Sequence, residues 1–157
     1  MSAASPEDLL AIGDRLVGRA AAGEQVEVFV ARGDSTEVRV WGGEVEHFVS
    51  AHSEGVGVRV VSGGRTGTAY AGTLEASAVD EVLEEARANA VFGTPDEFAG
   101  LVEPDGVDVV PIELWDERLP ATSTEDKIAL LTELERITLG LDGRVRVDEA
   151  DYSDGGG

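Results

Sequence analysis

The spacing of hydrophobic residues changes along the chain and separates helical from extended segments. In the first segment the apolar residues recur every three or four positions, at Leu9, Ile12, Leu16, Val17 and Ala20. Ser5 is a typical N-cap residue, and Pro6 suits the first helical position. The pattern therefore predicts a helix from Pro6 to Ala22, with Gly23 as its stop.

From residue 25 the hydrophobic period becomes two, which is typical of strands. It predicts five strands, at residues 25–31, 37–41, 44–53, 56–61 and 65–71. The predicted turns between them lie at Gly33-Asp34, Gly42-Gly43, Glu54-Gly55 and Ser62-Gly63-Gly64. Because turns this short join antiparallel neighbours, the block predicts an antiparallel meander.

Helical spacing returns after the strand block. A second helix is predicted over residues 75–92, with an inward stripe formed by Val79, Val82, Leu83, Ala86 and Ala90. Residues 94–120 hold four of the five prolines and predict a long connection, with a short strand at 107–110. A third helix is predicted from the caps Thr122 and Ser123 to Gly140, with Ile128, Leu131, Leu134 and Ile137 inward. One more strand is predicted from Val145 and Val147.

These elements predict an α+β fold, in which helices pack on one face of an antiparallel sheet of about five strands. A chain of 157 residues with 42% hydrophobic residues can form such a core. No internal repeat is visible in the sequence.

The net charge of the chain argues against some classes of binding partner. The net charge is −20, and residues 73–157 alone hold 22 acidic and six basic residues. Lys127 is the single lysine, and no basic cluster occurs, so nucleic acid and anionic membrane surfaces are poor partners. The absence of cysteine excludes disulfides and thiolate chemistry. Without a signal-like or membrane-spanning segment, we expect a cytoplasmic protein.

The two histidines, His47 and His52, lie in one predicted strand, where their odd separation points them to opposite faces. Even spacing instead aligns His52 with four other polar residues, Glu44, Glu46, Ser50 and Glu54. Such a set can bind a divalent cation, but we interpret it as a solvated strand face.

The glycine groups of the strand block match no complete phosphate-binding motif. Residues 55–60 lack the third glycine of a dinucleotide fingerprint, and residues 63–67 are not a P-loop. We interpret both groups as turns, and Arg59 and Arg65 as paired surface cations.

No serine, histidine and aspartate set can be assembled, and no H-E-x-x-H motif occurs. We interpret three acidic pairs as hydrated surface; they are Glu84-Glu85, Asp116-Glu117 and Asp148-Glu149. The run at residues 155–157 resembles both the tail of a carrier protein and a flexible linker. We therefore predict no catalytic, cofactor-binding or metal-binding residue in this chain.

The order of several segments resembles the amino-terminal domain of the TldD/PmbA family. In the strand block these are VEVFV at 26–30, WGGEVE at 41–46, EGVGVRV at 54–60 and GRTGTA at 64–69. After it come EARANA at 85–90, PDEFAGL at 95–101, LWD at 114–116 and STEDK at 123–127. The segment at 95–101 is more similar to the PmbA (TldE) type than to the TldD type.

The resemblance implies a cytoplasmic bacterial metallopeptidase system that degrades peptides and unfolded chains without ATP. In that family a TldD-type subunit holds zinc on an H-E-x-x-x-H helix and pairs with a PmbA-type subunit that lacks this motif. No zinc-ligand position of the family maps onto this chain, so we expect no cofactor here and zinc in the catalytic subunit. The implied domains are an amino-terminal α+β domain over residues 1–110, then a linker, a helix and the start of the following region over 111–157.

Two functions follow from these considerations. The first is the amino-terminal part of a peptidase subunit, which forms a scaffold, a dimer interface and the substrate entrance but is inactive alone. Its partners would be a TldD-type or PmbA-type subunit and a peptide or unfolded protein. The alternative is a free-standing, non-enzymatic module that binds a peptide or protein through a strand edge or an uncovered helix.

Overall fold

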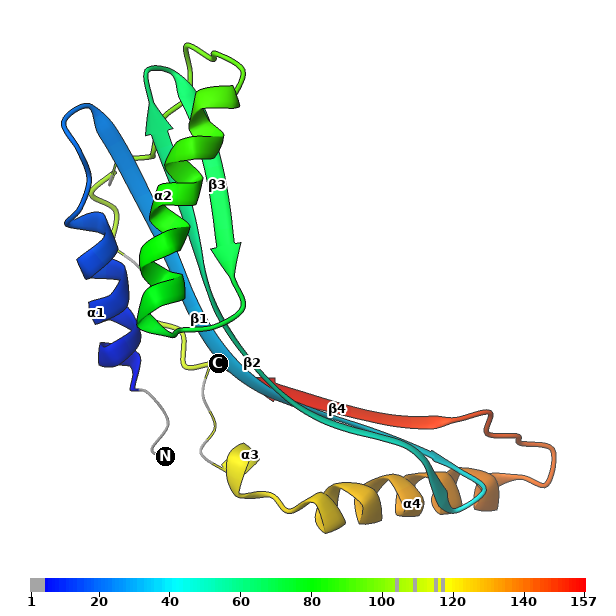
Figure 1. Ribbon diagram of the computed structural model, residues 1–157. Helices are drawn as coiled ribbons and strands as arrows, with labels where there is room; N and C mark the ends of the chain where they lie inside the picture. The colour runs from blue at the N-terminus through cyan, green and yellow to red at the C-terminus, as the bar shows by residue number, and fades with distance from the viewer. Residues whose placement is uncertain (1–4, 104, 109, 115, 117) are drawn as a thin grey trace. The chain divides into compact units, whose positions relative to one another are not determined.

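The computed structural model describes residues 5–103, 105–108, 110–114, 116 and 118–157. In this part of the chain the order of elements is α1 (Pro6–Val17), β1 (Glu24–Trp41), β2 (Glu44–Ser62), β3 (Arg65–Ala71), α2 (Ala76–Phe92), α3 (Arg118–Ala121), α4 (Thr124–Leu141) and β4 (Ala150–Gly156). Figure 1 shows these elements along the chain. The predicted α+β class is confirmed.

Four strands, within the described residues, form one sheet in the order β3-β2-β1-β4. β3 pairs antiparallel with the second half of β2, from Val56↔Ala71 to Ser62↔Arg65. β4 pairs antiparallel with the second half of β1, from Asp34↔Gly156 to Val40↔Ala150. The sheet therefore joins three consecutive strands and one strand from the far end of the sequence.

Two of the predicted turns are wrong, because β1 and β2 are single long strands. Gly33 has no positive φ, so β1 passes through Gly33-Asp34 and continues into its pairing with β4. Gly55 lies inside β2, where an added Cβ would stand 2.8 Å from the Ala71 carbonyl oxygen. It permits close approach of the backbone rather than a turn.

The other two predicted turns are confirmed. Gly42 and Gly43 between β1 and β2 have φ values of 62° and 81°. Gly63 and Gly64 between β2 and β3 have φ values of 56° and 71°. Positive φ at both central positions is the geometry of the tight hairpin turns whose twist matches that of the strands.

The chain forms two compact units, and β1 and β2 contribute to both. Unit 1 comprises residues 1–32 and 53–109, and unit 2 comprises residues 33–52 and 110–157. The tip of the β1–β2 hairpin thus belongs to the same unit as the carboxy-terminal segment.

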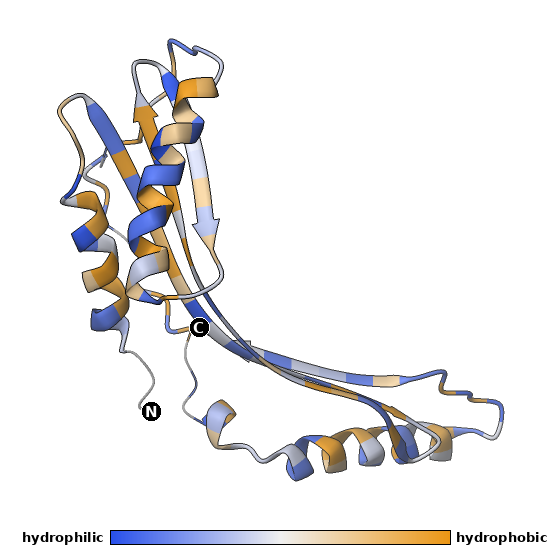
Figure 2. Cartoon of the chain, in the orientation of Figure 1, coloured by the Kyte–Doolittle hydropathy of each residue, from blue (hydrophilic) through white to orange (hydrophobic). Residues whose placement is uncertain are grey.

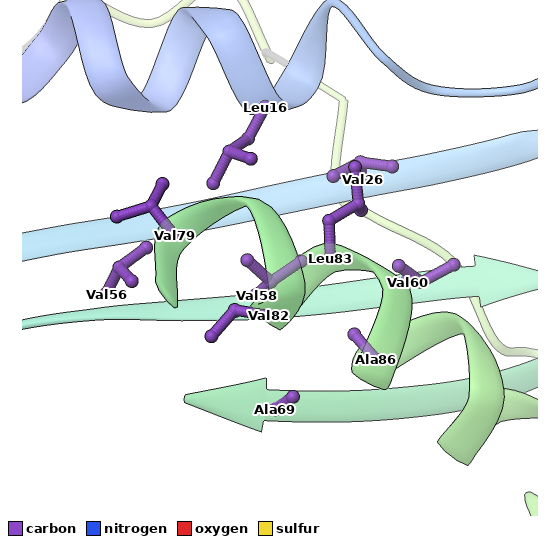
Figure 3. Packing of buried hydrophobic residues seen from close by; sticks show 10 residues of the cluster. All are labelled: Leu16, Val26, Val56, Val58, Val60, Ala69, Val79, Val82, Leu83 and Ala86. Atoms are coloured by element: carbon purple, nitrogen blue, oxygen red, sulfur yellow. The ribbon is translucent and has the colours of Figure 1, made fainter. Parts of the chain in front are cut away.

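Unit 1 packs α1 and α2 on one face of its strands (Figure 1). Figure 2 shows that both helices carry hydrophobic as well as hydrophilic residues, as amphipathic helices do. The α2 stripe is buried as predicted, with Leu83 and Ala86 fully buried. Figure 3 shows its counterparts, which are Leu16 of α1 and strand residues that include Val56, Val58 and Val60. The valines that alternate along β2 therefore present an apolar face to the helices, and Gly57 and Arg59 between them lie on the other face.

The start of α1 is confirmed, but its end is earlier than predicted. The Ser5 hydroxyl accepts the Asp8 amide, and the Asp8 carboxylate accepts the Ser5 amide in return. The helix ends at Val17, and the Glu24 carboxylate then accepts the Ala21 amide at 2.9 Å. This side-chain bond replaces a helical one, so residues 18–22 turn toward β1.

Unit 2 packs α4 on β1 and β4 around Val38, Val40, Leu131 and Ala150. α4 begins after the predicted cap Ser123, whose hydroxyl accepts the Asp126 amide. Leu131 and Ile128 face inward as predicted, but Leu134 and Ile137 are exposed. Instead the buried positions of α4 are Lys127, Leu131 and Glu135, because polar groups of the strands receive the two charged side chains.

The remaining extended predictions differ from the structure. The last strand is β4, which begins at Ala150 rather than at Val145, and Gly155 and Gly156 pair with β1 within it. The predicted strand at 107–110 is not formed at residues 107, 108 and 110, and residue 109 lies outside the described residues. In the described part of the chain, no helix has the length and apolarity needed to cross a bilayer.

Candidate functional site

The histidines do not come together in a metal site. His52 lies in β2 with its Nδ1 2.8 Å from Asp34 Oδ1. His47 is exposed on the same strand, five residues away. Among the described residues, no group of three or more histidine, aspartate and glutamate side chains is placed to hold a metal ion. The residues described here therefore do not fit a zinc site.

The predicted polar face of β2 is mostly exposed, as a solvated face requires. Glu44, Glu46 and Ser50 are exposed, whereas Glu54 is half-buried. One Glu54 oxygen accepts the Leu74 amide at 3.3 Å, and the other lies 3.4 Å from Arg32. Glu54 thus ties the segment between β3 and α2 to β2.

The cations that stand out in the sequence have structural partners. Arg59 Nε donates to Glu27 at 2.8 Å on the surface, as predicted. Arg65 donates instead to the Gly93 carbonyl oxygen, next to the end of α2. Each acidic pair has one member in an ion pair with arginine: Glu84 with Arg19, Asp116 with Arg118 and Glu149 with Arg39. Glu117 lies outside the described residues.

Lys127 is one of the two buried charged residues of α4. Its Nζ lies 2.6 Å from Asp154 Oδ2 and 3.4 Å from Thr36 Oγ1, and 5.7 Å from the centre of the Tyr152 ring. The Tyr152 hydroxyl donates to the same Asp154 oxygen. These side chains come from α4, β1 and β4, so the cluster joins the helix to two strands.

The environment of Asp154 favours its charged form. Burial raises the pKa of this carboxyl, but the hydrogen bonds from Lys127, Tyr152 and Thr36 and the charge of Lys127 together lower the pKa below its ordinary value. The bond to Asp154, together with burial, raises the pKa of the Tyr152 hydroxyl. A cavity of about 320 Å³ borders the cluster, lined in part by Ser35, Ser50 and Pro120. The ammonium already has a carboxylate partner, so its charge is neutralised within the fold.

Glu135, also on α4, is 3% exposed and binds the β1–β2 turn. Its two carboxylate oxygens accept the amides of Gly42 at 2.8 Å and Gly43 at 2.7 Å. A charged acceptor with two donors can be buried because its lost hydration is replaced. No signal in the sequence marks this role, since Glu135 looks like one of many surface acids.

In unit 1 a chain of alternating charges links α1 to α2. Arg15 and Arg19 both contact Asp80, and Arg19 also contacts Glu84. Arg87 bridges Glu84 to Glu24, which it meets at 2.8 Å. Hydrogen bonds from Arg87 and from the Ala21 amide lower the pKa of Glu24. This network fixes the first turn after α1. It contains no nucleophile and no pair of carboxyl groups whose pKa values are shifted in opposite directions to serve as acid and base.

One region of the chain matches the model of a known protein family. Residues 26–90 match the model of PmbA/TldA metallopeptidase domain 1. They cover β1, β2, β3 and most of α2. The chain contains an amino-terminal TldD/PmbA domain. The resemblance seen in the order of sequence segments is therefore confirmed.

Three solved structures share the fold of this TldD/PmbA domain. A candidate modulator of a DNA gyrase from Thermotoga maritima has a TM-score of 0.74 and 21% identity over 93% of this chain. TldE from Thermococcus kodakarensis has a TM-score of 0.71 and 20% identity over 95%. A candidate modulator of DNA gyrase from Bacteroides thetaiotaomicron has a TM-score of 0.70 and 18% identity over 96%.

The chain spans only about a third of each of these proteins, which are covered to 33%, 32% and 35%. No curated protein matches the sequence. At these identities the likeness establishes the fold of the TldD/PmbA domain, not the activity of the longer proteins.

Proposed function

We propose that this chain is the amino-terminal part of a TldD/PmbA-type metallopeptidase subunit that acts in ATP-independent proteolysis of peptides or unfolded chains. Its contribution is a scaffold, a dimer interface and control of substrate access, while bond cleavage belongs to a zinc site elsewhere in the assembly. The segment at 95–101 favours the PmbA (TldE) type. The partner is then a TldD-type subunit.

The observation that carries the proposal is the match of residues 26–90 to the first domain of the family. The geometry is compatible with it. The buried charges, Lys127, Asp154, Glu24 and Glu135, are each satisfied by partners within the fold. Such groups stabilise packing and are not poised for proton or metal chemistry.

A cleavage assay tests this proposal directly. A fluorescently labelled unfolded polypeptide is incubated with zinc and three samples: the 157-residue chain, the chain joined to a family carboxy-terminal domain, and that fusion with a TldD-type partner. We expect cleavage only with the partner, and its loss with a chelator. The matched control replaces the histidines of the partner's H-E-x-x-x-H motif with alanine. Zinc-dependent turnover by the 157 residues alone would refute the assignment.

A second function, a non-enzymatic peptide- or protein-interaction module, is favoured by one observation on α4. Four of its apolar side chains are exposed by 49% to 75%, at Leu130, Leu134, Ile137 and Leu141. Their spacing of four, three and four residues places them on one stripe beside the stripe that packs on the sheet. Sedimentation separates the alternatives: a complete module stays monomeric, whereas a domain that needs a larger partner self-associates through this stripe.

A further inference from the structure

The face of the unit 1 sheet opposite α1 and α2 contains a hollow between two exposed aromatic side chains. Val56, Val58 and Val60 point to the helices, so Gly57 and Arg59, which alternate with them on β2, point to the other face. The hollow has a volume of about 530 Å³. Its lining includes Glu27, Phe29, Gly57, Arg59, Thr68 and Tyr70.

Gly57 forms the floor of this hollow because it has no side chain. Tyr70 is its direct partner on β3, so the two residues share a face. An added Cβ at Gly57 would meet nothing within 4 Å, which shows that the space above it is open. A glycine that is not required by positive φ or by close packing is unusual in a strand.

A structural explanation would be that the aromatic ring covers the glycine of the neighbouring strand, which is a known way to stabilise such pairs. The exposure of the rings argues against it. Tyr70 is 86% exposed and Phe29 is 71% exposed, so neither ring lies folded over Gly57. Two large apolar groups therefore stand in solvent on either side of an empty position.

Arg59 adds a charged group at a fixed spacing from the hollow. Its Nε donates to Glu27 at 2.8 Å, whereas its two terminal nitrogens have no hydrogen-bond partner among the described residues. In a strand, Gly57 and Arg59 are two residues apart, or roughly 6.6 Å. A guanidinium in this state binds a carboxylate with two parallel hydrogen bonds.

We propose that this hollow, together with Arg59, is a docking site for an extended peptide segment. The peptide places one aromatic or large aliphatic side chain over Gly57, between Phe29 and Tyr70. The residue two positions further along the peptide is acidic, and its carboxylate binds Arg59. An extended ligand has the same two-residue period as β2, so both contacts form at once. A shallow, open hollow suits one side chain of a chain that passes over it and does not enclose a small molecule.

This inference rests on the proposed function, because it names the surface on which an unfolded substrate chain is held. The ligand class follows from complementarity: an apolar group for the aromatic slot and an anion for the free face of Arg59. Three features lie on one face of three neighbouring strands. They are the unoccupied position above Gly57, the two aromatic side chains beside it and the guanidinium of Arg59.

The test uses the 157-residue chain and the probe peptide acetyl-Ala-Phe-Ala-Glu-Ala-amide, with binding followed by NMR shifts of backbone amides. We expect the largest shifts at Phe29, Gly57, Arg59 and Tyr70. A peptide with alanine in place of phenylalanine, or glutamine in place of glutamate, should bind about tenfold more weakly.

Variants of the chain supply the second arm. Gly57→Val fills the hollow with a residue suited to strands, and Arg59→Gln removes the cation; each should weaken binding about tenfold. Tyr70→Thr removes one wall without leaving a buried void. The matched control is Leu10→Ser, which removes an exposed apolar side chain, 68% exposed, from α1.

The inference is overturned if the shifts lie elsewhere, if the two altered peptides bind as well as the probe, or if Gly57→Val and Tyr70→Thr both bind it unchanged. A dimer that is lost in Gly57→Val would assign the face to a second copy and would also overturn it. Because binding is measured without cleavage, failure here leaves the peptidase assignment standing. Failure of the cleavage assay likewise leaves this binding result intact.

Discussion

Two single residues of α4 show that a charged side chain can be buried in a small core when it has polar partners. Lys127 and Glu135 occupy positions on α4 where an apolar residue is expected, and each has a polar partner on the strands. The sequence predicts the inward position of Leu131 from its spacing. It does not predict the two charged neighbours, because their partners are far along the chain, at Asp154 in β4 for Lys127 and in the β1–β2 turn for Glu135.

Asp154 and Lys127 should couple strongly. Replacing Lys127 with methionine leaves a buried carboxylate without its cation, and we expect a loss of about 2–4 kcal/mol in the free energy of unfolding. The double variant Lys127→Met/Asp154→Asn should lose less than the sum of the two single variants. Urea unfolding of the four proteins measures this coupling, and simple additivity would contradict it.

The pH dependence of unit 2 follows from the same pair. Because the folded pKa of Asp154 lies below its ordinary value of 3.8, its contribution is fully present above about pH 4 and is lost as the pH falls through the folded value. Asp154→Asn should therefore flatten the acid side of the stability curve below about pH 4. Glu24, whose pKa is lowered from 4.5 in unit 1, keeps its own contribution in that variant and serves as the internal comparison.

A glycine on β3 sets the distance between strand and helix. A Cβ at Gly67 would lie 2.2 Å from both the Ala86 oxygen and the Ala90 nitrogen of α2. We expect Gly67→Ala to destabilise the chain by about 1–3 kcal/mol through overpacking. Gly57→Ala is the matched control, since its Cβ meets no atom within 4 Å. Equal urea midpoints for the two variants would show that α2 can move away without cost.

At the scale of elements, features that depend on neighbouring residues were predicted correctly, whereas a feature that depends on pairing with a distant strand was not. The start of α1, the α2 stripe and the turns at Gly42-Gly43 and Gly63-Gly64 depend on neighbouring residues, and they were predictable. The continuity of β1 through Gly33 was not, because β4, which pairs with this part of β1, lies more than a hundred residues later. Turn-like residues do not form a turn where a partner strand holds the chain extended.

The attachment of α4 to the β1–β2 turn should depend on the charge of Glu135. Glu135→Gln keeps the shape of the side chain but replaces one of its two acceptor oxygens with an amide donor. We expect a loss of about 2 kcal/mol and faster hydrogen exchange at the amides of Gly42 and Gly43. Exchange in unit 1, for example at Val58, should be unchanged. Unchanged exchange at both turn amides would show that Glu135 does not hold them.

At the scale of the whole molecule, the main property that the packing of the core does not explain is the excess of acidic over basic residues. The chain holds 32 acidic and 12 basic residues, so self-repulsion in the folded state exceeds the attraction of its surface ion pairs. Added sodium chloride should therefore raise stability, by about 1 kcal/mol or a few degrees in Tm. Thermal unfolding at low and moderate salt measures this effect. A fall in Tm would mean that ion pairs such as Arg87 with Glu24 outweigh the net repulsion.

The family was predictable only through the resemblance, because the sequence contains no complete catalytic motif. The order of short segments identified the TldD/PmbA domain, although each segment alone is degenerate. The hollow over Gly57 was invisible in the sequence, since a glycine between valines predicts a turn as readily as an empty floor. Only the pairing of Gly57 with an exposed Tyr70 distinguishes the two.

The burial of Lys127 has a practical consequence. As the single lysine of the chain, it carries the one side-chain amine, and its ammonium is enclosed between α4 and β4. Because this side chain is little exposed and its nitrogen is paired with Asp154, an amine-reactive reagent should react fastest when the helix separates from the strand. The rate of acylation at Lys127, read by mass spectrometry of the peptide that contains it, thus reports the opening of unit 2 in the unmodified protein, with no engineered probe.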